Sequence, residues 1–175
     1  MNKYIRITLI VVAGLAAAFF VLRTCTKFKS PEATAVFRQG GLDVEVNYCQ
    51  PAKKGRAVFG TLLPYGQVWR TGANEATLIT FNKDVALAGK PLKAGKYTLW
   101  TIPNANEWTI IINGQTGQWG TSYDESQDVL RANVPLKTNP DAVELFTVGF
   151  TTQTGGADML LSWDKAGVAV PIRVQ

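Results

Sequence analysis

Residues 42–48 alternate strictly between apolar and polar side chains, and this alternation constrains the fold more than any other feature of the chain. Successive side chains of a β-strand point to opposite faces of a sheet, so the pattern predicts a strand with one buried face. Gly40 and Gly41 stand directly before it and predict a tight turn from an earlier strand at residues 33–38. We therefore expect an antiparallel strand pair at this point.

Runs of β-branched and aromatic residues continue to the C-terminus, separated by glycine- and proline-rich turn signals. With no helical pattern of ten or more residues, they indicate an all-β fold, an antiparallel, jelly-roll-like β-sandwich, as one domain over residues 30–175. The irregular stretch 114–127 is expected to hold a loop or a short helix. Pro171 predicts an edge strand, because proline cannot donate to a ladder. The further predicted strands are 77–81, 96–102, 108–112, 129–136, 143–150, 159–163 and 168–174.

Residues 7–22 form an apolar segment without any charge. Such a helix spans roughly 24 Å, against about 30 Å of bilayer hydrocarbon. The segment therefore predicts one short transmembrane helix, within an anchor region of residues 1–29. Basic residues flank it almost equally on both sides, so charge does not fix its orientation.

Two other interpretations of the N-terminal segment stay open, a cleaved signal peptide and a lipid anchor at Cys25. Both need small residues before the processing point, and Arg23-Thr24 stands there instead. An uncleaved anchor fits these residues better. The expected location is the bacterial inner membrane, single-pass, with the domain facing the periplasm; a secreted or lipid-anchored chain is the alternative.

The net charge of +5 belongs to the membrane flanks and not to the domain. Five of the 18 basic residues lie in the first 29 residues, which hold no Asp or Glu, so the remainder has 13 basic and 13 acidic residues. A neutral domain gives no reason to expect nucleic-acid binding. The chain has no histidine, which excludes Ser-His-Asp and Cys-His catalysis and histidine-ligated zinc. We expect no metal, no cofactor and no disulfide between Cys25 and Cys49.

Candidate ligand-binding residues gather in the glycine-rich stretch 53–77, which is expected to form loops on a rigid sheet. A guanidinium fork, an amide and a carboxylate could meet a polar ligand there. An equally physical alternative is a structural ion pair between Arg70 and Glu75, with Asn74 supporting the turn. Catalytic residues stay unknown. The candidates are Arg56, Trp69, Arg70, Asn74 and Glu75.

The five tryptophans allow two interpretations. Trp69, Trp100 and Trp119 lie nearest to predicted loops and could form a stacking platform for a sugar. Trp108 and Trp163 lie within strand patterns and are expected in the core, which is where aromatic residues of a sandwich are commonly found.

The strings GRAVFG at 55–60 and LPYGQVWRTGANEAT at 63–77 resemble the bacterial family called domain of unknown function 2911. Similar pieces follow at 92–99, 101–103, 107–109, 119–120 and 170–172, so the resemblance extends over roughly residues 30–174. It implies an exported bacterial protein but no established activity or catalytic residues. Relatives usually begin with what looks like a cleavable signal peptide, whereas the N-terminal segment of this chain fits an anchor better.

These features favour a non-enzymatic module, held at the membrane through residues 7–22, that binds a protein or a glycan of the cell envelope. One alternative is a carboxylate-dependent hydrolase of envelope glycans. It would need a second carboxyl group about 5 to 9.5 Å from Glu75 across an open cleft. Another alternative is a structural subunit of a membrane complex.

Overall fold

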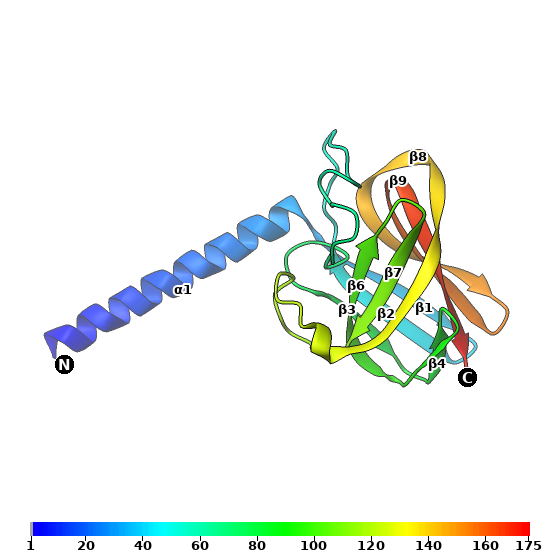
Figure 1. Ribbon diagram of the computed structural model, residues 1–175. Helices are drawn as coiled ribbons and strands as arrows, with labels where there is room; N and C mark the ends of the chain where they lie inside the picture. Colours follow the sequence, from blue (N-terminus) through cyan, green and yellow to red (C-terminus); the bar gives the residue numbers. More distant parts are fainter. Residues whose placement is uncertain (1) are drawn as a thin grey trace.

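Helix α1 (Lys3–Lys29) leads into an all-β domain, and Figure 1 shows the helix standing away from the strands. This computed structural model describes residues 2–175, apart from the side chains of residues 16–25. One 3-10 turn, η1 (Glu125–Gln127), lies in the stretch where a loop or short helix was expected. The strands in the described part are β1 (Glu32–Gln39), β2 (Leu42–Cys49), β3 (Thr77–Phe81), β4 (Val85–Leu87), β5 (Lys90–Leu92), β6 (Gly95–Pro103), β7 (Glu107–Asn113), β8 (Asp128–Gln153) and β9 (Gly156–Val174).

The described strands pair antiparallel in the order β1-β2-β3-β6-β7-β8-β9-β4-β5, which confirms the all-β prediction. Neighbours in the sheet are mostly neighbours in the chain, as in a meander. The jelly-roll order that we expected is therefore wrong, because a jelly roll is built from Greek-key connections. The exception to the meander is the short hairpin β4–β5, which follows β3 in the chain but pairs with the end of β9.

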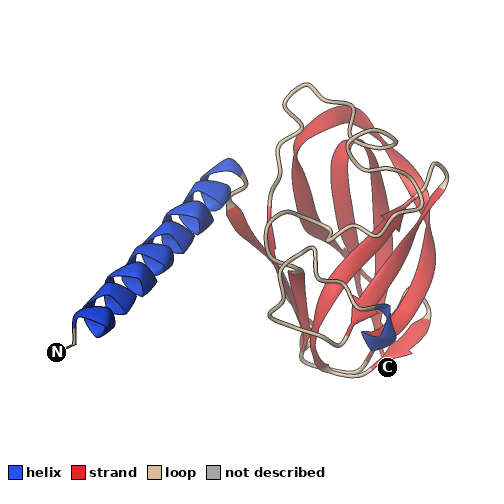
Figure 2. Ribbon diagram, turned by 60° about the vertical axis from the view of Figure 1, so that its left-hand side comes forward, coloured by secondary structure: helices blue, strands red, loops and turns tan. Residues whose placement is uncertain are grey.

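Strands β8 and β9, labelled in Figure 1, form one long, bent hairpin, and Figure 2 shows the strands gathered in one body apart from the N-terminal helix. β8 pairs with β7 through its first part and with β9 through its second, and the register shifts between Thr138 and Thr147. The Thr152 hydroxyl donates to the Gln39 side-chain oxygen over 2.9 Å, so the far end of β8 lies against the edge strand β1. The sequence predicted two shorter strands in each of these regions.

The core follows the alternation that the sequence contains. Leu42, Val44 and Val46 of β2 are fully buried, whereas Asp43 between them is exposed. Trp108 and Trp163 are buried as expected, and Trp69 joins them. The Trp69 and Trp163 rings stack with their centroids 5.7 Å apart. Aromatic rings in such offset or edge-on contacts contribute free energy beyond their burial alone.

Pro171 does not mark an edge strand, which corrects the sequence prediction. Strand β9 lies between β8 and β4 in the sheet. Around Pro171 the pairing with β8 has ended at Val168, and β4 pairs with β9 from Ile172 onward. The Pro171 carbonyl oxygen accepts a hydrogen bond from the Ala88 amide over 2.7 Å, so this position takes part in the sheet as an acceptor only.

Helix α1 carries exposed apolar side chains over its described N-terminal half, among them Ile10, Val12 and Leu15. A search of the described residues finds no helix that is both long and apolar enough to cross a membrane. The predicted span 7–22 continues into residues 16–25, whose side chains lie outside the described part of the chain, and the Cys25 thiol lies there too.

Candidate functional site

The connection between β2 and β3, residues 50–76, carries all the candidate residues and is held by three bridges, the first from Ala52 to Leu145 of β8. Trp69 bridges to Thr101 of β6, and Glu75 bridges to Trp119 in the connection before η1. Buried hydroxyl groups hold the segment between these bridges, because Thr71 donates to the Thr101 hydroxyl over 3.1 Å. Two depressions lie along this fixed loop, one with Glu75 in its wall and the other with Trp69 and Arg70.

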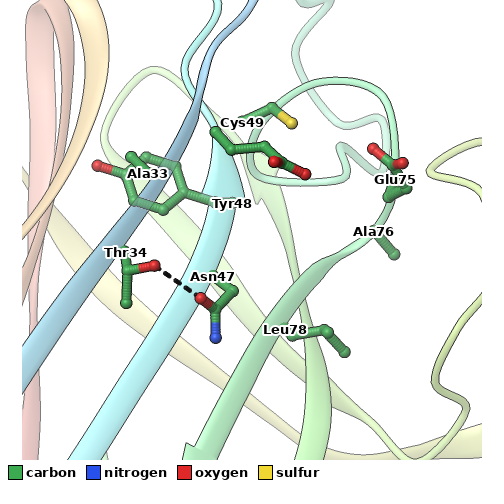
Figure 3. A pocket seen from close by; sticks show the side chains of 9 residues that line it. Ala33, Thr34, Asn47, Tyr48, Cys49, Glu75, Ala76 and Leu78 are labelled. Carbon is green, nitrogen blue, oxygen red and sulfur yellow. Dashed lines mark hydrogen bonds between the residues drawn. The ribbon is translucent and has the colours of Figure 1, made fainter. Parts of the chain in front are cut away.

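The first depression, which we call the junction groove, lies beside the C-terminal end of α1 and has a volume of about 360 Å³. Its wall combines the first residues of β1, the last residues of β2 and the segment that enters β3 (Figure 3). On its floor the Thr34 hydroxyl donates to the Asn47 side-chain oxygen over 2.7 Å. The polar and titratable side chains that line it are Glu32, Thr34, Asn47, Tyr48, Cys49 and Glu75.

Lys27, from the last turn of α1, lies between the two carboxylates of the junction groove. Its ammonium group contacts Glu32 and lies 3.7 Å from Glu75 Oε1. The Asn74 amide donates to the Thr26 carbonyl oxygen over 3.5 Å, which adds a second contact between the loop and the helix end. Asn74 itself has a φ of 61°, a conformation that asparagine tolerates better than most residues. The helix end and the groove are thus joined by charge and by hydrogen bonding.

The Cys49 thiol is buried at the end of the groove. Burial raises its pKa, and the nearby Glu75 and Glu32 carboxylates raise it further, against the opposing effects of a hydrogen bond with Asn74 and of the Lys27 charge. Because the thiolate is the reactive form of cysteine, this environment keeps Cys49 in its unreactive, protonated form.

The second depression, the arginine cleft, lies on the other side of the loop and has a volume of about 200 Å³. Arg70 lines it together with Gln67, Gly120 and apolar side chains of the 62–68 segment. The Arg70 Nε atom is buried and has no hydrogen-bond partner. Burial lowers the pKa of this guanidinium group. No ion pair joins Arg70 to Glu75 in the described part of the chain, so the structural pair left open by the sequence is not formed.

Gly120 lines the arginine cleft and packs closely against Arg70 and the backbone of Asn74. Its amide donates to the Asn74 carbonyl oxygen over 3.0 Å, and a Cβ atom at this position would lie 2.3 Å from Arg70 Cδ. The observed position of the Arg70 side chain therefore leaves no room for a side chain at residue 120.

Comparison with protein families gives one match, to the family described as "Protein of unknown function (DUF2911)", over residues 30–172. The chain belongs to the DUF2911 family. The match confirms the resemblance found in the sequence and covers the strands from β1 to most of β9, with both depressions; α1 lies outside it. No curated protein and no solved structure matches the chain.

The DUF2911 domain brings only some of the sequence candidates together. Glu75 lines the junction groove and Asn74 contacts the adjacent end of α1, whereas Arg70 lies in the other cleft. Arg56 donates to the carbonyl oxygens of Ala52 and Lys53 and so closes its own turn.

The tryptophan platform is not assembled either. Trp69 and Trp100 are buried, at 7% and 2% exposure, so their faces are covered by protein. Trp119 is 41% exposed and is the one member of the proposed platform that solvent reaches. A stacked sugar could therefore meet one indole ring of this set and not three.

Sequence reasoning missed Lys27, Glu32 and Cys49 as members of the groove. For Glu32 and Cys49 the sequence does contain a usable signal. The turn at residues 40–41 fixes the hairpin register, and that register places Glu32 opposite Cys49, as the structure has it. The position of Lys27 depends on the path of the chain between α1 and β1, for which the sequence has no comparable signal. No group of three or more Cys, Asp or Glu side chains suited to a metal occurs among the described residues.

Proposed function

We propose that this chain is a membrane-anchored, extracytoplasmic binding module whose DUF2911 domain engages a protein or glycan partner in the cell envelope without catalysis. The observation that carries the proposal is the exposed apolar surface of α1. Ile10 and Leu15 are 71% and 67% exposed, and their neighbours on the helix are similarly uncovered. Apolar surface left in water costs about 25 cal/mol per Å² relative to burial, so a surface of this kind is expected to be covered by another phase or molecule.

A lipid bilayer fits this surface better than a protein groove does. The sequence stays free of charge from residue 7 through residue 22, and basic residues stand on both sides of that stretch. Apolar side chains occur on all sides of the helix instead of forming one stripe, as is typical of a helix that is surrounded by lipid.

The binding role is supported by the position of the two depressions. Both are lined in part by the connection between β2 and β3, and one of them lies directly beside the end of α1. Loops carried on a rigid sheet are a common location for ligand contacts. A tether that ends beside the junction groove would hold that groove close to the membrane surface.

The test is a pull-down from detergent-solubilised envelope with the full chain as bait, against a tether-only control of residues 1–29. We expect a partner that the full chain recovers reproducibly and the control does not. An Arg38→Gln chain serves as a second control, because Arg38 is exposed on the edge strand β1, away from both depressions. Recovery no better than with the tether alone would contradict the binding role.

A second candidate, carboxylate-dependent glycan hydrolysis, is favoured by one observation. Glu32 and Glu75 line the same open groove and contact the same ammonium group. Paired carboxylates across a cleft are the usual machinery of glycosidases. Lys27 occupies the space near both groups, so a substrate would have to displace it. Release of reducing ends from envelope glycans, lost in both Glu32→Gln and Glu75→Gln, would support hydrolysis; no release by the unaltered chain would remove it.

A further inference from the structure

The arginines of the β domain differ in whether their guanidinium groups have a carboxylate or carbonyl partner. Arg131 and Arg173 pair with Asp128 and Asp158 over 2.7 and 2.8 Å, and Arg38 lies 3.8 Å from Glu45. Arg56 donates to main-chain carbonyl oxygens. Arg70 contacts neither a carboxylate nor a carbonyl oxygen in the described structure, although it is more deeply placed than Arg38 or Arg56.

This arrangement is costly for the folded chain. A guanidinium group stays charged at neutral pH, and a buried donor without a partner forfeits the hydrogen bond that it made with water. A charge withdrawn from water is normally compensated by an opposite charge. No carboxylate or carbonyl oxygen compensates the Arg70 guanidinium group in the described structure, so the cleft that it lines has an unpartnered positive charge in its wall.

The shape of the cleft is compatible with such an acceptor. Its volume of about 200 Å³ exceeds that of a phosphate or carboxylate group, so the rest of a ligand could enter as well. Gln67 adds an amide at the rim, while Leu62 and Pro64 add apolar wall. No Asp or Glu lines the cleft, so nothing in the wall repels an anion.

We propose that the arginine cleft binds an oxyanion, a carboxylate or phosphate group, of the molecule that the domain recognises, through the Arg70 guanidinium group. Guanidinium groups bind such oxyanions through two parallel hydrogen bonds, which fixes the orientation of the ligand as well as holding it. This inference deepens the proposed function by naming the chemistry of the ligand, and rests on it only for the identity of the partner as an envelope component.

The experiment is a titration of the full chain in neutral detergent with inorganic phosphate and, separately, with acetate, each against sodium chloride at the same ionic strength. The readout is the ¹⁵N–¹H resonance of Arg70 Nε, assigned by its loss in Arg70→Gln. We expect a saturable shift of this resonance with at least one of the two anions. A response to phosphate alone identifies a phosphate-bearing ligand, and a response to acetate alone a carboxylate.

Two variants sharpen the result. Arg38→Gln should keep the saturable response of the Arg70 resonance. Arg70→Lys should bind the anion about tenfold more weakly in calorimetry, because lysine keeps the charge but lacks the planar fork. No saturable shift with either anion would overturn the inference. So would a shift equal to that in chloride, or an unchanged affinity in Arg70→Gln measured by calorimetry. Because the titration uses no envelope partner, its failure would leave the pull-down result untouched, and the reverse also holds.

Discussion

At the scale of a single residue, Gly120 allows the loop backbone at Asn74 and the Arg70 side chain to pack closely together. A Cβ atom there would lie 2.6 Å from the Asn74 carbonyl oxygen as well as against Arg70. The arginine side chain is flexible and could move, but the carbonyl oxygen is held by the hydrogen bond from Gly120 itself. The cost of a larger residue therefore falls mainly on the backbone of the loop.

Gly120→Ala is expected to lower the free energy of unfolding by about 1–3 kcal/mol, the usual cost of overpacking. Gly149→Ala is the matched control, because nothing lies within 4 Å of a Cβ at Gly149. That control should leave stability unchanged or raise it by up to about 1 kcal/mol. Urea unfolding of the two variants compares them, and equal stabilities would contradict the packing assigned to Gly120.

Arg70→Met is expected to leave the free energy of unfolding in chloride buffer unchanged or slightly higher, because it removes a donor that has no partner. Arg131→Met should instead lower it by about 1–3 kcal/mol, because it leaves the largely buried Asp128 carboxylate without its cation. Thermal and urea unfolding test the pair. A loss in Arg70→Met as large as in Arg131→Met would mean that Arg70 has a structural role and not a ligand-binding one.

At the scale of elements, one hydrogen-bonded network fixes the connection that runs through η1 into β8. The Tyr123 hydroxyl donates to Asp128 Oδ2 over 2.6 Å and accepts from Arg131 Nη2 over 2.8 Å. Burial, followed by the hydrogen bond to the Asp128 carboxylate, raises the pKa of Tyr123 from 10.0 to about 12. The folded chain therefore favours the neutral phenol.

This pKa shift has a direct consequence for alkaline stability. The stabilisation is complete below pH 10, where the tyrosine is neutral in both the folded and the unfolded chain, and it is lost as the pH rises through about 12. Urea unfolding between pH 9 and 12 should show a fall in stability that is smaller in Tyr123→Phe, which cannot ionise. An identical fall in both chains would contradict the shift.

The strands show what local sequence can and cannot predict. Strand β3 was predicted with its observed bounds, because its five residues form a run rich in β-branched and aromatic side chains. Strands β4 and β5 were missed because three residues are too few to show a period, and the turn between them was the stronger signal. β8 and β9 were divided because the polar corner near Asn139 has the composition of a loop, while its pairing depends on residues 25 or more positions away.

The candidate site was predicted in part for the same reason. The loop with Arg70, Asn74 and Glu75 was identified from its glycines and its mixed charges. The contact of Glu75 with Lys27 and the packing of Arg70 against Gly120 arise through the folded chain and not through neighbouring sequence. Local pattern therefore predicted which residues carry the chemistry but not which of them act together.

At the scale of the whole molecule, an apolar helix leads into a β domain whose junction groove lies beside the helix end. In Figure 1 α1 points away from the strands, and Lys27 is the residue through which the helix end contacts the junction groove. A membrane around the first part of the helix would leave this contact at the lipid–water boundary, where a basic residue is favourable.

The proposal that α1 anchors the uncleaved chain in a membrane is tested most directly by membrane partition of the full chain, combined with its intact mass. We expect the chain to have the mass of the uncleaved protein and to stay in the membrane fraction through an alkaline wash. The double variant Val12→Asp, Leu15→Asp should be released, because each aspartate at the centre of a span costs about 2.5–3.5 kcal/mol, whereas Val36→Asp on the exposed edge strand should stay with the membrane. A wild-type chain found in the wash, or one that has lost its first 29 residues, would contradict the account.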